Sequence, residues 1–424
     1  MKKIGVLALT VILVFAFTVP ASALENIFGG FWRTRMYQQR NFDGDNLDTQ
    51  DNVLVDTRTR LYYTAKLNDN LKFVNKFEFD TVWGSAAGFG RVGTDAVAIE
   101  VKNSYADFNL GPVNVLVGAQ DFYLARGFIA DEDGVGMKVV YKLNDSIVLP
   151  FAWQRMYDGN DAGVGEDRTR GDIDLYVFAP GITLSKDISI RPIYVFAHAQ
   201  DGAVFSTVVP AYAAGTFNNI NISMAGLDFD AKLGPASLWF TGIKQFGDIQ
   251  LAAGGNTIDV EGYLLAAGGN FNFGKADIHG QAFFATGEEN GVADGEISAF
   301  LTTGTTSYYW AEIMGSGVFD NQVSAGSCDM FVSNVLAANI GTTITPTDKL
   351  SVSFDLWYAK LDEENAFGED ELGLETDVKI TYQLVEGLSL DVVGAYLFAG
   401  DATSADGKND KDPYEFGTQL SLSF

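Results

Sequence analysis

The chain has little of what disulfide-stabilised, metal-dependent or hydrolytic proteins depend on. Among its 424 residues there are one cysteine and two histidines. Cys328 alone cannot form an internal disulfide, so stability must come from backbone pairing and burial. His198 and His279 lie far apart, which excludes a histidine-rich metal site and leaves no ordered Ser-His-Asp set. We therefore expect no enzyme activity, no cofactor and no specific metal site.

Long apolar runs are absent, with one exception. Lys2 and Lys3 precede the run IGVLALTVILVFAFTVP, and Ala21-Ser22-Ala23 follows it. A charged start, an apolar stretch and a small-residue cleavage site predict a secretory signal peptide over residues 1–23, with an N-terminal membrane anchor as the alternative. No later run approaches the roughly 20 apolar residues of a membrane-spanning helix. Residues 24–424 are expected to form one domain.

Positive charge is scarce. Lys and Arg total 28 against 55 Asp and Glu, a formal net charge of −27. Binding to nucleic-acid phosphates needs the opposite sign, so we expect no nucleic-acid partner.

Aromatic and glycine residues are abundant, and they follow a period of two. The chain has 46 Gly, 32 Phe and 17 Tyr against 9 Pro. In LKFVNKFEF (71–79) apolar residues occupy one parity and charged residues the other, and ELGLETDVKITYQL (371–384) repeats the pattern. Such alternation predicts strands with one apolar and one polar face. No helical periodicity competes with it.

The connections between these strands alternate in length. Very short turns alternate with longer polar loops such as 41–52, 157–171, 201–219 and 400–412. A soluble sandwich or propeller has no reason to sort loops by length, whereas a transmembrane barrel has short turns on one side and long loops on the other. We expect an all-β, antiparallel transmembrane barrel of 18 strands. The region 286–334 leaves barrels of 16 or 20 strands as alternatives. The short turns lie near residues 68–70, 111–112, 144–146, 186–187, 234–235, 274–275, 346–348 and 386–387.

The chain ends on EFGTQLSLSF, with Tyr414, Leu420, Leu422 and Phe424 on one parity. The signal peptide, the strands, the sorted loops and this ending together resemble those of Gram-negative outer-membrane porins. The resemblance covers the whole of residues 24–424. The resemblance implies that these four residues form the signal read by the barrel-assembly machinery. It also implies contact with outer-membrane lipid and lipopolysaccharide, and a homotrimer as found in many porins.

The function expected on this basis is a passive, water-filled channel for small hydrophilic solutes and ions. Two alternatives stay open. One is a substrate-specific channel for an oligosaccharide or an organic anion. The other is a structural or partner-binding barrel without free conduction. Porins with 18 strands include sugar-specific channels and the alginate-export channel, and no signature in this sequence points to either.

Selection in a porin depends on lumen charge and radius. All 11 arginines precede residue 192. Parity places basic residues of the first three strands in the lumen, near acidic residues of the last strands, so that opposed charges would line a narrow opening. The alternative is that the arginines pair with nearby acids and only stiffen the wall. The basic candidates are Arg33, Arg35, Arg58, Arg60, Lys72 and Lys76, and the acidic ones Asp355, Glu375, Asp377 and Asp391.

The longest connection, 286–334, contains TTSYYWAEIMGSGVFDNQ. This segment is too apolar for a freely solvated loop. An inward-folded constriction loop near Tyr308, Tyr309, Trp310 and Glu312 is one hypothesis; an external cap or a further strand pair is the other.

Two other motifs are weaker indications of function. GFGRVG (88–93) matches a dinucleotide-binding spacing but lies in a loop and opens no predicted helix. The acidic stretches 43–48, 131–134 and 406–412 offer oxygen ligands, but none has the spacing of a calcium loop, so at most loose divalent-ion binding is expected.

Overall fold

The computed structural model describes residues 24–45, 51–85, 99–157, 173–199, 217–251, 256–289, 295–302, 306–408 and 410–424. The expected signal peptide (1–23) and the GFGRVG segment (88–93) lie outside the described residues. In the part of the chain that is described, no helix has the length and apolarity needed to cross a membrane.

The described chain consists almost entirely of strands. One 3-10 turn, η1 (Ala125–Gly127), joins β5 to β6. The strands are β1 (Glu25–Arg40), β2 (Asn52–Asn68), β3 (Leu71–Val82), β4 (Glu100–Leu110), β5 (Val113–Leu124), β6 (Ala130–Lys142), β7 (Ile147–Tyr157), β8 (Ile173–Phe178), β9 (Gly181–Ser185), β10 (Ile188–Ala199), β11 (Phe217–Leu233), β12 (Ala236–Leu251), β13 (Thr257–Val260), β14 (Tyr263–Asn272), β15 (Ala276–Ala285), β16 (Glu296–Ile297), β17 (Val335–Thr347), β18 (Leu350–Lys360), β19 (Glu371–Val385), β20 (Leu388–Ala399) and β21 (Tyr414–Ser423).

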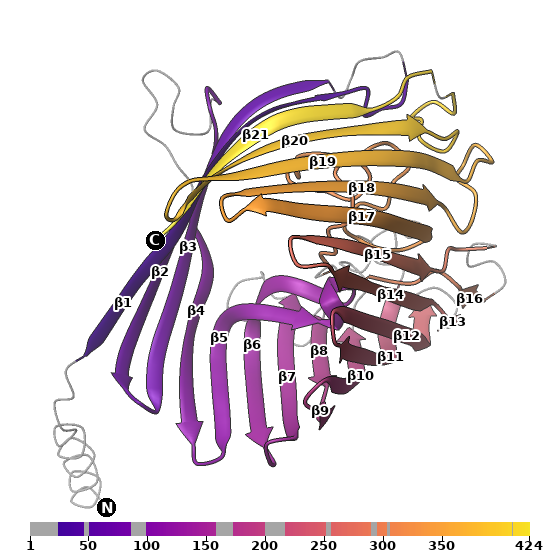
Figure 1. Ribbon diagram of the computed structural model, residues 1–424. Coiled ribbons are helices and arrows are strands. Elements are labelled where there is room, and N and C mark those ends of the chain that lie inside the picture. Colours follow the sequence, from indigo (N-terminus) through magenta and orange to yellow (C-terminus); the bar gives the residue numbers. More distant parts are fainter. Residues whose placement is uncertain are drawn as a thin grey trace, which may run out of the picture.

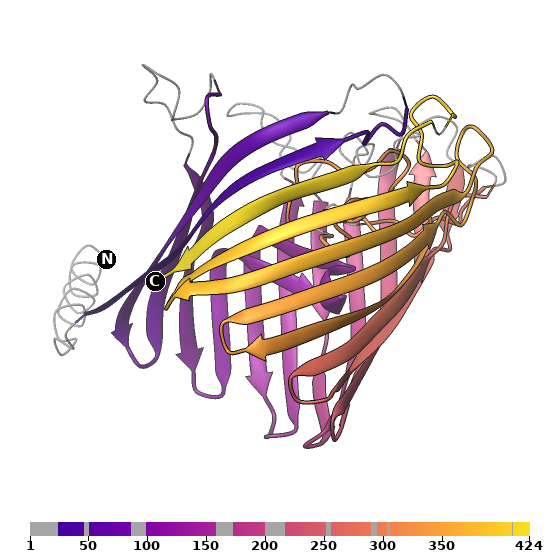
Figure 2. The same ribbon diagram turned by 45° about the horizontal axis from the view of Figure 1, so that its top comes forward.

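Each strand of the wall pairs antiparallel with its neighbours in sequence, and the first strand pairs with the last. β1 meets β21 in a continuous register that runs from Phe31 opposite Ser423 to Arg40 opposite Tyr414. This pairing closes the sheet into a barrel, with the chain's C-terminus beside β1 (Figures 1 and 2). Closure leaves no strand edge, which is the condition for strands to cross a lipid bilayer.

The wall has the predicted 18 strands. β8 and β9 both pair with β7 and β10, so they are one interrupted strand, and β13 and β14 likewise form one strand beside β12. β16 is a two-residue bridge parallel to β13 and is not part of the ring. The count of 18 and the antiparallel closed fold are therefore confirmed, and the alternatives of 16 and 20 are wrong.

The two faces of the wall differ as the alternation predicted. On β21, Phe416 is 53% exposed on the outside, whereas its neighbour Glu415 is 2% exposed on the inside. Large apolar side chains are exposed on the outside of many other strands, among them Phe240, Leu265 and Phe354. An apolar outer band of this kind matches a bilayer interior.

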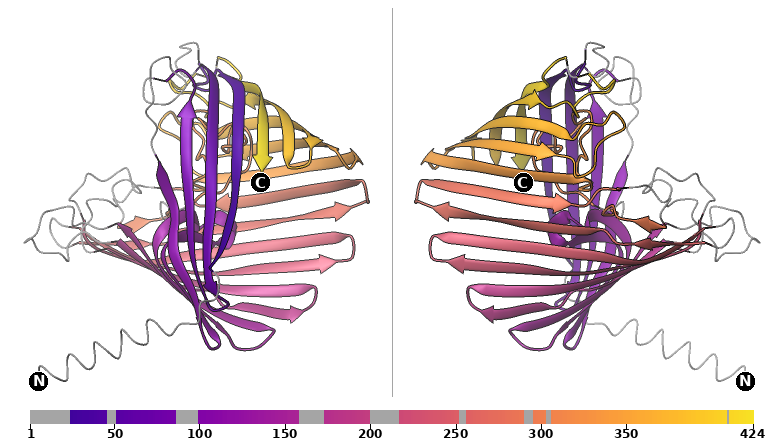
Figure 3. Two further views of the ribbon diagram at one scale, coloured as in Figure 1. Left: turned by 90° about the vertical axis from the view of Figure 1, so that its left-hand side faces the viewer. Right: turned by 90° about the vertical axis from the view of Figure 1, so that its right-hand side faces the viewer.

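The connections are sorted by length at the two ends of the barrel. Tight turns join β2 to β3, β4 to β5, β6 to β7, β9 to β10, β11 to β12, β14 to β15, β17 to β18 and β19 to β20. Most connections at the opposite end are longer, and the side views in Figure 3 show the tight turns along one rim.

The lipid-facing assignment of β21 can be tested by placing a charge on either face. Leu420→Lys should lower the free energy of unfolding by up to about 2–4 kcal/mol, because a lysine on the lipid face has this cost at the bilayer midplane and a smaller one toward the interfaces. Gln419→Lys, one residue away on the lumen face, should have a much smaller effect. Urea titration of the refolded protein in lipid vesicles measures both values. Equal losses for the two variants would contradict the assignment.

Candidate functional site: the barrel lumen

Part of the long connection between β15 and β17, residues 306–324, lies inside the barrel. Its described residues contact lumen-facing side chains of β1, β15, β18 and β19, and Figures 1 and 2 show its trace within the ring of strands. We call residues 306–324 the inner segment. The inner segment is therefore neither an external cap nor a further strand pair of the wall.

Backbone hydrogen bonds to two lumen carboxylates hold the inner segment against β19. The Ile313 and Met314 amides donate to Glu375 at 2.6 and 2.9 Å, and the Glu312 amide donates to Asp377 at 3.4 Å. Glu375 is fully buried and Asp377 nearly so. Two of the four predicted acidic lumen residues thus accept hydrogen bonds from the backbone of the inner segment.

A second set of contacts joins the inner segment to β1. The Arg35 guanidinium donates to Asp56 on β2 at 2.7 Å, to Asp320 at 2.5 Å and to the Val318 carbonyl at 2.5 Å. Phe319 stacks on Tyr37 with ring centroids 4.6 Å apart. Burial raises the pKa of Asp320, but Arg35 and then Arg33 outweigh it, so the pKa lies below its usual value. The carboxylate therefore stays ionised and paired.

Aromatic contacts seat the start of the inner segment. Tyr308 stacks on Phe128 at 3.8 Å, and its hydroxyl donates to the Gln281 side chain at 2.6 Å. Trp310 packs edge-on against Trp357 of β18 at 5.3 Å. Tyr309, the residue between them, is 50% exposed and faces open lumen.

A second element, which the sequence analysis missed, also enters the lumen. The β5–β6 connection (125–129) folds inward and carries Arg126 to the far wall. There Arg126 donates to Asp230 at 2.8 Å and to Thr241 at 3.1 Å, and it lies 4.8 Å from the Trp239 ring. The signal in the sequence is a short, apolar connection at the rim where other connections are long and polar.

Apolar side chains fill part of the lumen, so the predicted alternation of one apolar and one polar face does not hold along every strand. Inward-facing side chains of β10–β12 pack with the β5–β6 connection and the inner segment into one cluster. The sequence carries a hint, because the strands concerned are apolar on both parities over part of their length. The cluster includes Ile193, Val195, Ile220, Ile222, Met224, Ile243 and Ile249.

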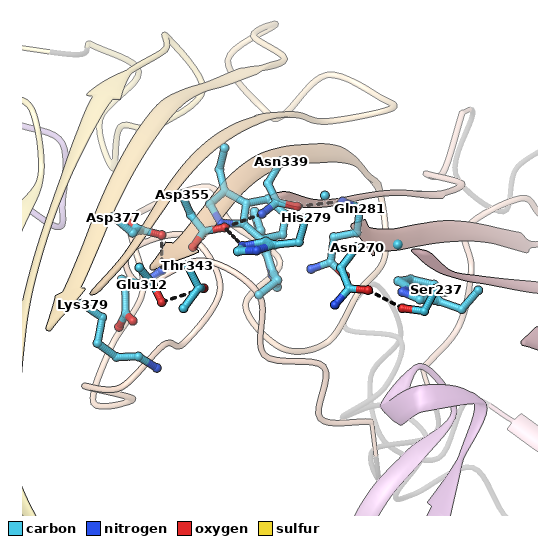
Figure 4. Close-up of a pocket in the computed structure, with 16 residues that line it drawn as sticks. Ser237, Asn270, His279, Gln281, Glu312, Asn339, Thr343, Asp355, Asp377 and Lys379 are labelled. Atoms are coloured by element: carbon cyan, nitrogen blue, oxygen red, sulfur yellow. Dashed lines mark hydrogen bonds and ion pairs between the residues drawn. The ribbon is translucent and has the colours of Figure 1, made fainter. Parts of the chain in front are cut away.

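Two cavities border the inner segment. One, of about 800 Å³, lies beside Tyr309 and Asp320 and is bounded by β1–β6 and by Gln419 of β21. We call it the charged cavity. The other, of about 500 Å³, lies beside Trp310 and Glu312 and is bounded by β12, β14, β15 and β17–β19 (Figure 4). We call it the polar cavity.

The predicted basic residues face the lumen, and each has an acidic partner. Arg33 lies 3.6 Å from Asp320, Arg58 pairs with Asp80 at 2.5 Å, and Arg60 pairs with Glu78. Lys72 pairs with Asp107 at 3.0 Å and Lys76 with Asp121 at 3.6 Å. Carboxylates slightly outnumber cations around the charged cavity, so it holds opposed charges without a basic excess. Its lining includes Arg33, Arg58, Arg60, Lys76 and Lys102 with Glu78, Asp121, Asp131, Glu132, Asp133 and Asp320.

The remaining predicted residues lie in three places. Asp355 lines the polar cavity with Asp377 and Glu312. Asp391 accepts hydrogen bonds from Thr381 at 2.6 Å and Gln419 at 3.2 Å. Tyr414, Leu420 and Leu422 lie on the outer face, and the Phe424 carbonyl accepts the Gly30 amide at 2.8 Å. Their role as an assembly signal stays a prediction. The described residues include no cluster of three or more His, Cys, Asp or Glu side chains that could hold a metal ion.

Comparison with known proteins supports the fold. No family model matches the chain, and no curated protein matches its sequence. Among solved structures, the chain is similar to Acinetobacter baumannii OccAB4, with a TM-score of 0.61 and 12% identity over 96% of this chain and 99% of that one. It is also similar to a BenF-like porin from Pseudomonas fluorescens Pf-5 (TM-score 0.58, 12% identity, 94% and 99% covered) and to Pseudomonas aeruginosa OccK11, also called OpdR (0.56, 11%, 94% and 96%). The barrel fold expected from the resemblance to porins is thereby confirmed.

The carboxyl group of Glu312 makes the seating of the inner segment dependent on pH. Burial raises the pKa of Glu312 to about 7, although the Val318 amide and Lys379 act in the opposite direction. The ordinary pKa of a glutamate is about 4.3, so the seated segment keeps a proton that a released segment loses. Seating is therefore most favourable below this ordinary pKa and weakens as the pH rises toward about 7.

Hydrogen exchange of residues 306–324 at pH 5 and pH 8, corrected for the intrinsic rate, tests this dependence. We expect stronger protection at pH 5, by on the order of 3 kcal/mol or less. Glu312→Gln should shrink the difference, whereas Glu364→Gln, at an exposed site, should leave it unchanged. A full pH difference in Glu312→Gln would assign the effect to other groups.

Proposed function

We propose that the protein is an outer-membrane channel through which small hydrophilic solutes and ions diffuse. The observation that carries this proposal is a closed barrel with an apolar outside and lumen cavities lined by charged and polar side chains. Residues 1–23 act as the signal for export. The outer-membrane lipid surrounds the apolar band, and the assembly machinery reads the C-terminal strand.

Selection takes place where the inner segment narrows the lumen. Tyr309 and Asp320 approach the basic side chains of β1 and β2 on one side, and the acidic residues of the β5–β6 hairpin face the same cavity. Opposed charges across an opening orient dipolar solutes and filter ions by sign. Because every basic candidate is paired and carboxylates predominate, the channel favours cations weakly over anions.

The inner segment is a fixed constriction. Charged hydrogen bonds to Arg35, two backbone amides on Glu375 and stacked aromatic rings hold it at both ends. The charged cavity and the polar cavity lie beside a loop held in this way, and this space supports passive diffusion over the alternative of a barrel without conduction.

Planar-bilayer recording tests the channel and its charge filter together. The wild-type protein should conduct ohmically and show a small reversal potential of cationic sign in a salt gradient. Arg33→Glu combined with Arg58→Glu should shift that potential further toward cations. The control, Lys142→Glu with Lys232→Glu, changes the net charge equally at exposed residues near the tight turns and should leave it unchanged.

Absence of any conductance would contradict the channel proposal. Conductance with no shift in the Arg33/Arg58 variant would remove those two residues from the path of the ions.

A further inference from the structure

The polar cavity has a lining that the barrel wall does not need. Its residues come from six strands and from the inner segment, and many carry hydrogen-bonding groups directed into the space (Figure 4). Its volume of about 500 Å³ lies within the range of small-molecule sites.

Two amide side chains offer free donors. The Ser237 hydroxyl donates to the Asn270 oxygen at 2.5 Å, and the Tyr308 hydroxyl donates to the Gln281 oxygen at 2.6 Å. Each contact fixes the amide and leaves its nitrogen without an acceptor among the described residues. A fixed NH₂ group facing a cavity is a donor prepared for a ligand oxygen.

A carboxylate on the opposite part of the lining offers an acceptor. Oδ1 of Asp355 receives His279 Nε2 at 3.0 Å and Asn339 Nδ2 at 2.7 Å, while the other oxygen receives no hydrogen bond from the described residues. His279 is held in turn by Asp277 through Nδ1 at 2.7 Å. Glycine at position 341 makes room for this pair, since a Cβ there would collide with both Asp355 and His279.

The charges around the cavity do not select an ion. Lys379 lines it without an ion pair among the described residues, but Glu312, Asp355 and Asp377 line it as well. An anion would face the carboxyl groups of Glu312, Asp355 and Asp377, and a cation would face Lys379 and His279, whose two ring nitrogens both contact carboxylates. A neutral molecule that both donates and accepts hydrogen bonds meets neither penalty.

Indole rings complete the lining. Trp239, Trp310 and Trp357 border the cavity, and contacts hold two of them: Arg126 lies over Trp239 at 4.8 Å, and the Trp310 nitrogen donates to the Asp329 carbonyl at 3.0 Å. Rigid aromatic surface beside fixed polar groups suits a ring that has both C–H faces and hydroxyl groups.

We propose that the polar cavity is a binding subsite for neutral, polyhydroxylated solutes of sugar size. Their hydroxyl groups accept from Asn270, Gln281 and Lys379 and donate to Asp355, while their C–H faces contact the indoles. The inference rests on the proposed channel function, because the solute reaches the cavity through the water-filled lumen.

Block of ion current by maltose tests the subsite. We expect concentration-dependent block of the wild-type channel, with succinate and putrescine blocking much less. Asn270→Leu should raise the half-blocking concentration about tenfold, the loss of one fixed hydrogen bond. Lys379→Met, which breaks no ion pair within the described residues, should raise it in the same direction.

Gln419→Leu is the matched control, because it makes the same kind of change in the charged cavity. It should leave the maltose block unchanged. Heat-modifiable migration on a gel shows that each variant is folded before it is recorded.

The outcomes separate the two proposals. A channel that conducts but is not blocked by maltose overturns the subsite alone. So does a block that Gln419→Leu weakens as much as Asn270→Leu, or a stronger block by succinate that depends on Asn270. A barrel that does not conduct overturns the channel proposal and the subsite with it.

Discussion

The pairing of β1 with β21 is the constraint on which the rest of the structure depends. Backbone amides and carbonyls cannot be left unpaired in hydrocarbon, so a sheet that spans a bilayer must close on itself. The ten-residue register from Phe31–Ser423 to Arg40–Tyr414 achieves that closure. It explains why the chain ends on an apolar alternating strand: the terminus is an internal strand of the ring, with Leu420 and Leu422 outside and Gln419 and Ser421 inside.

Closure creates a second problem, because a ring of 18 strands is too wide to select small solutes by its wall alone. Two elements of the chain fold inward and narrow the lumen. The β5–β6 connection crosses the lumen through Arg126 and packs apolar side chains against β10–β12. The inner segment is held by Arg35 and Glu375 on the other side. Beside these two elements lie the charged cavity and the polar cavity.

The fold could be predicted from the sequence because each strand repeats the same simple signal. Alternation such as Leu71, Phe73, Phe77 and Phe79 against Lys72, Lys76 and Glu78 requires only one apolar and one polar environment, and the sorting of loop lengths fixes which rim each connection lies on. Parity also predicts the lumen position of six basic residues: Arg33, Arg35, Arg58, Arg60, Lys72 and Lys76. The apolar character of the inner segment predicts that it packs against other parts of the protein, but only the tertiary contacts with β1, β15, β18 and β19 give its position.

The site could be predicted less well, since the partners of its residues are far away in the sequence. Nothing local to Arg126 indicates Asp230, and nothing near Glu375 indicates the amides of Ile313 and Met314. The polar cavity combines Asn270, Gln281, Asp355 and Lys379, and alternation places each of them inside without showing that they meet. Depth along the barrel and distance across the lumen are set by the ring and by its filling, which a period-two pattern does not encode.

If the inner segment lies in the water path of a conducting channel, Tyr309 points toward that path and Tyr308 points away from it. Cysteine at each position, in a Cys328→Ser background, tests this with a charged, water-soluble thiol reagent added during single-channel recording. Tyr309→Cys channels should show a stepwise fall in current on modification. Tyr308→Cys channels should show none, because that side chain is buried against Phe128. An unchanged current at both positions, or an equal fall in current at both, would contradict this placement of the inner segment.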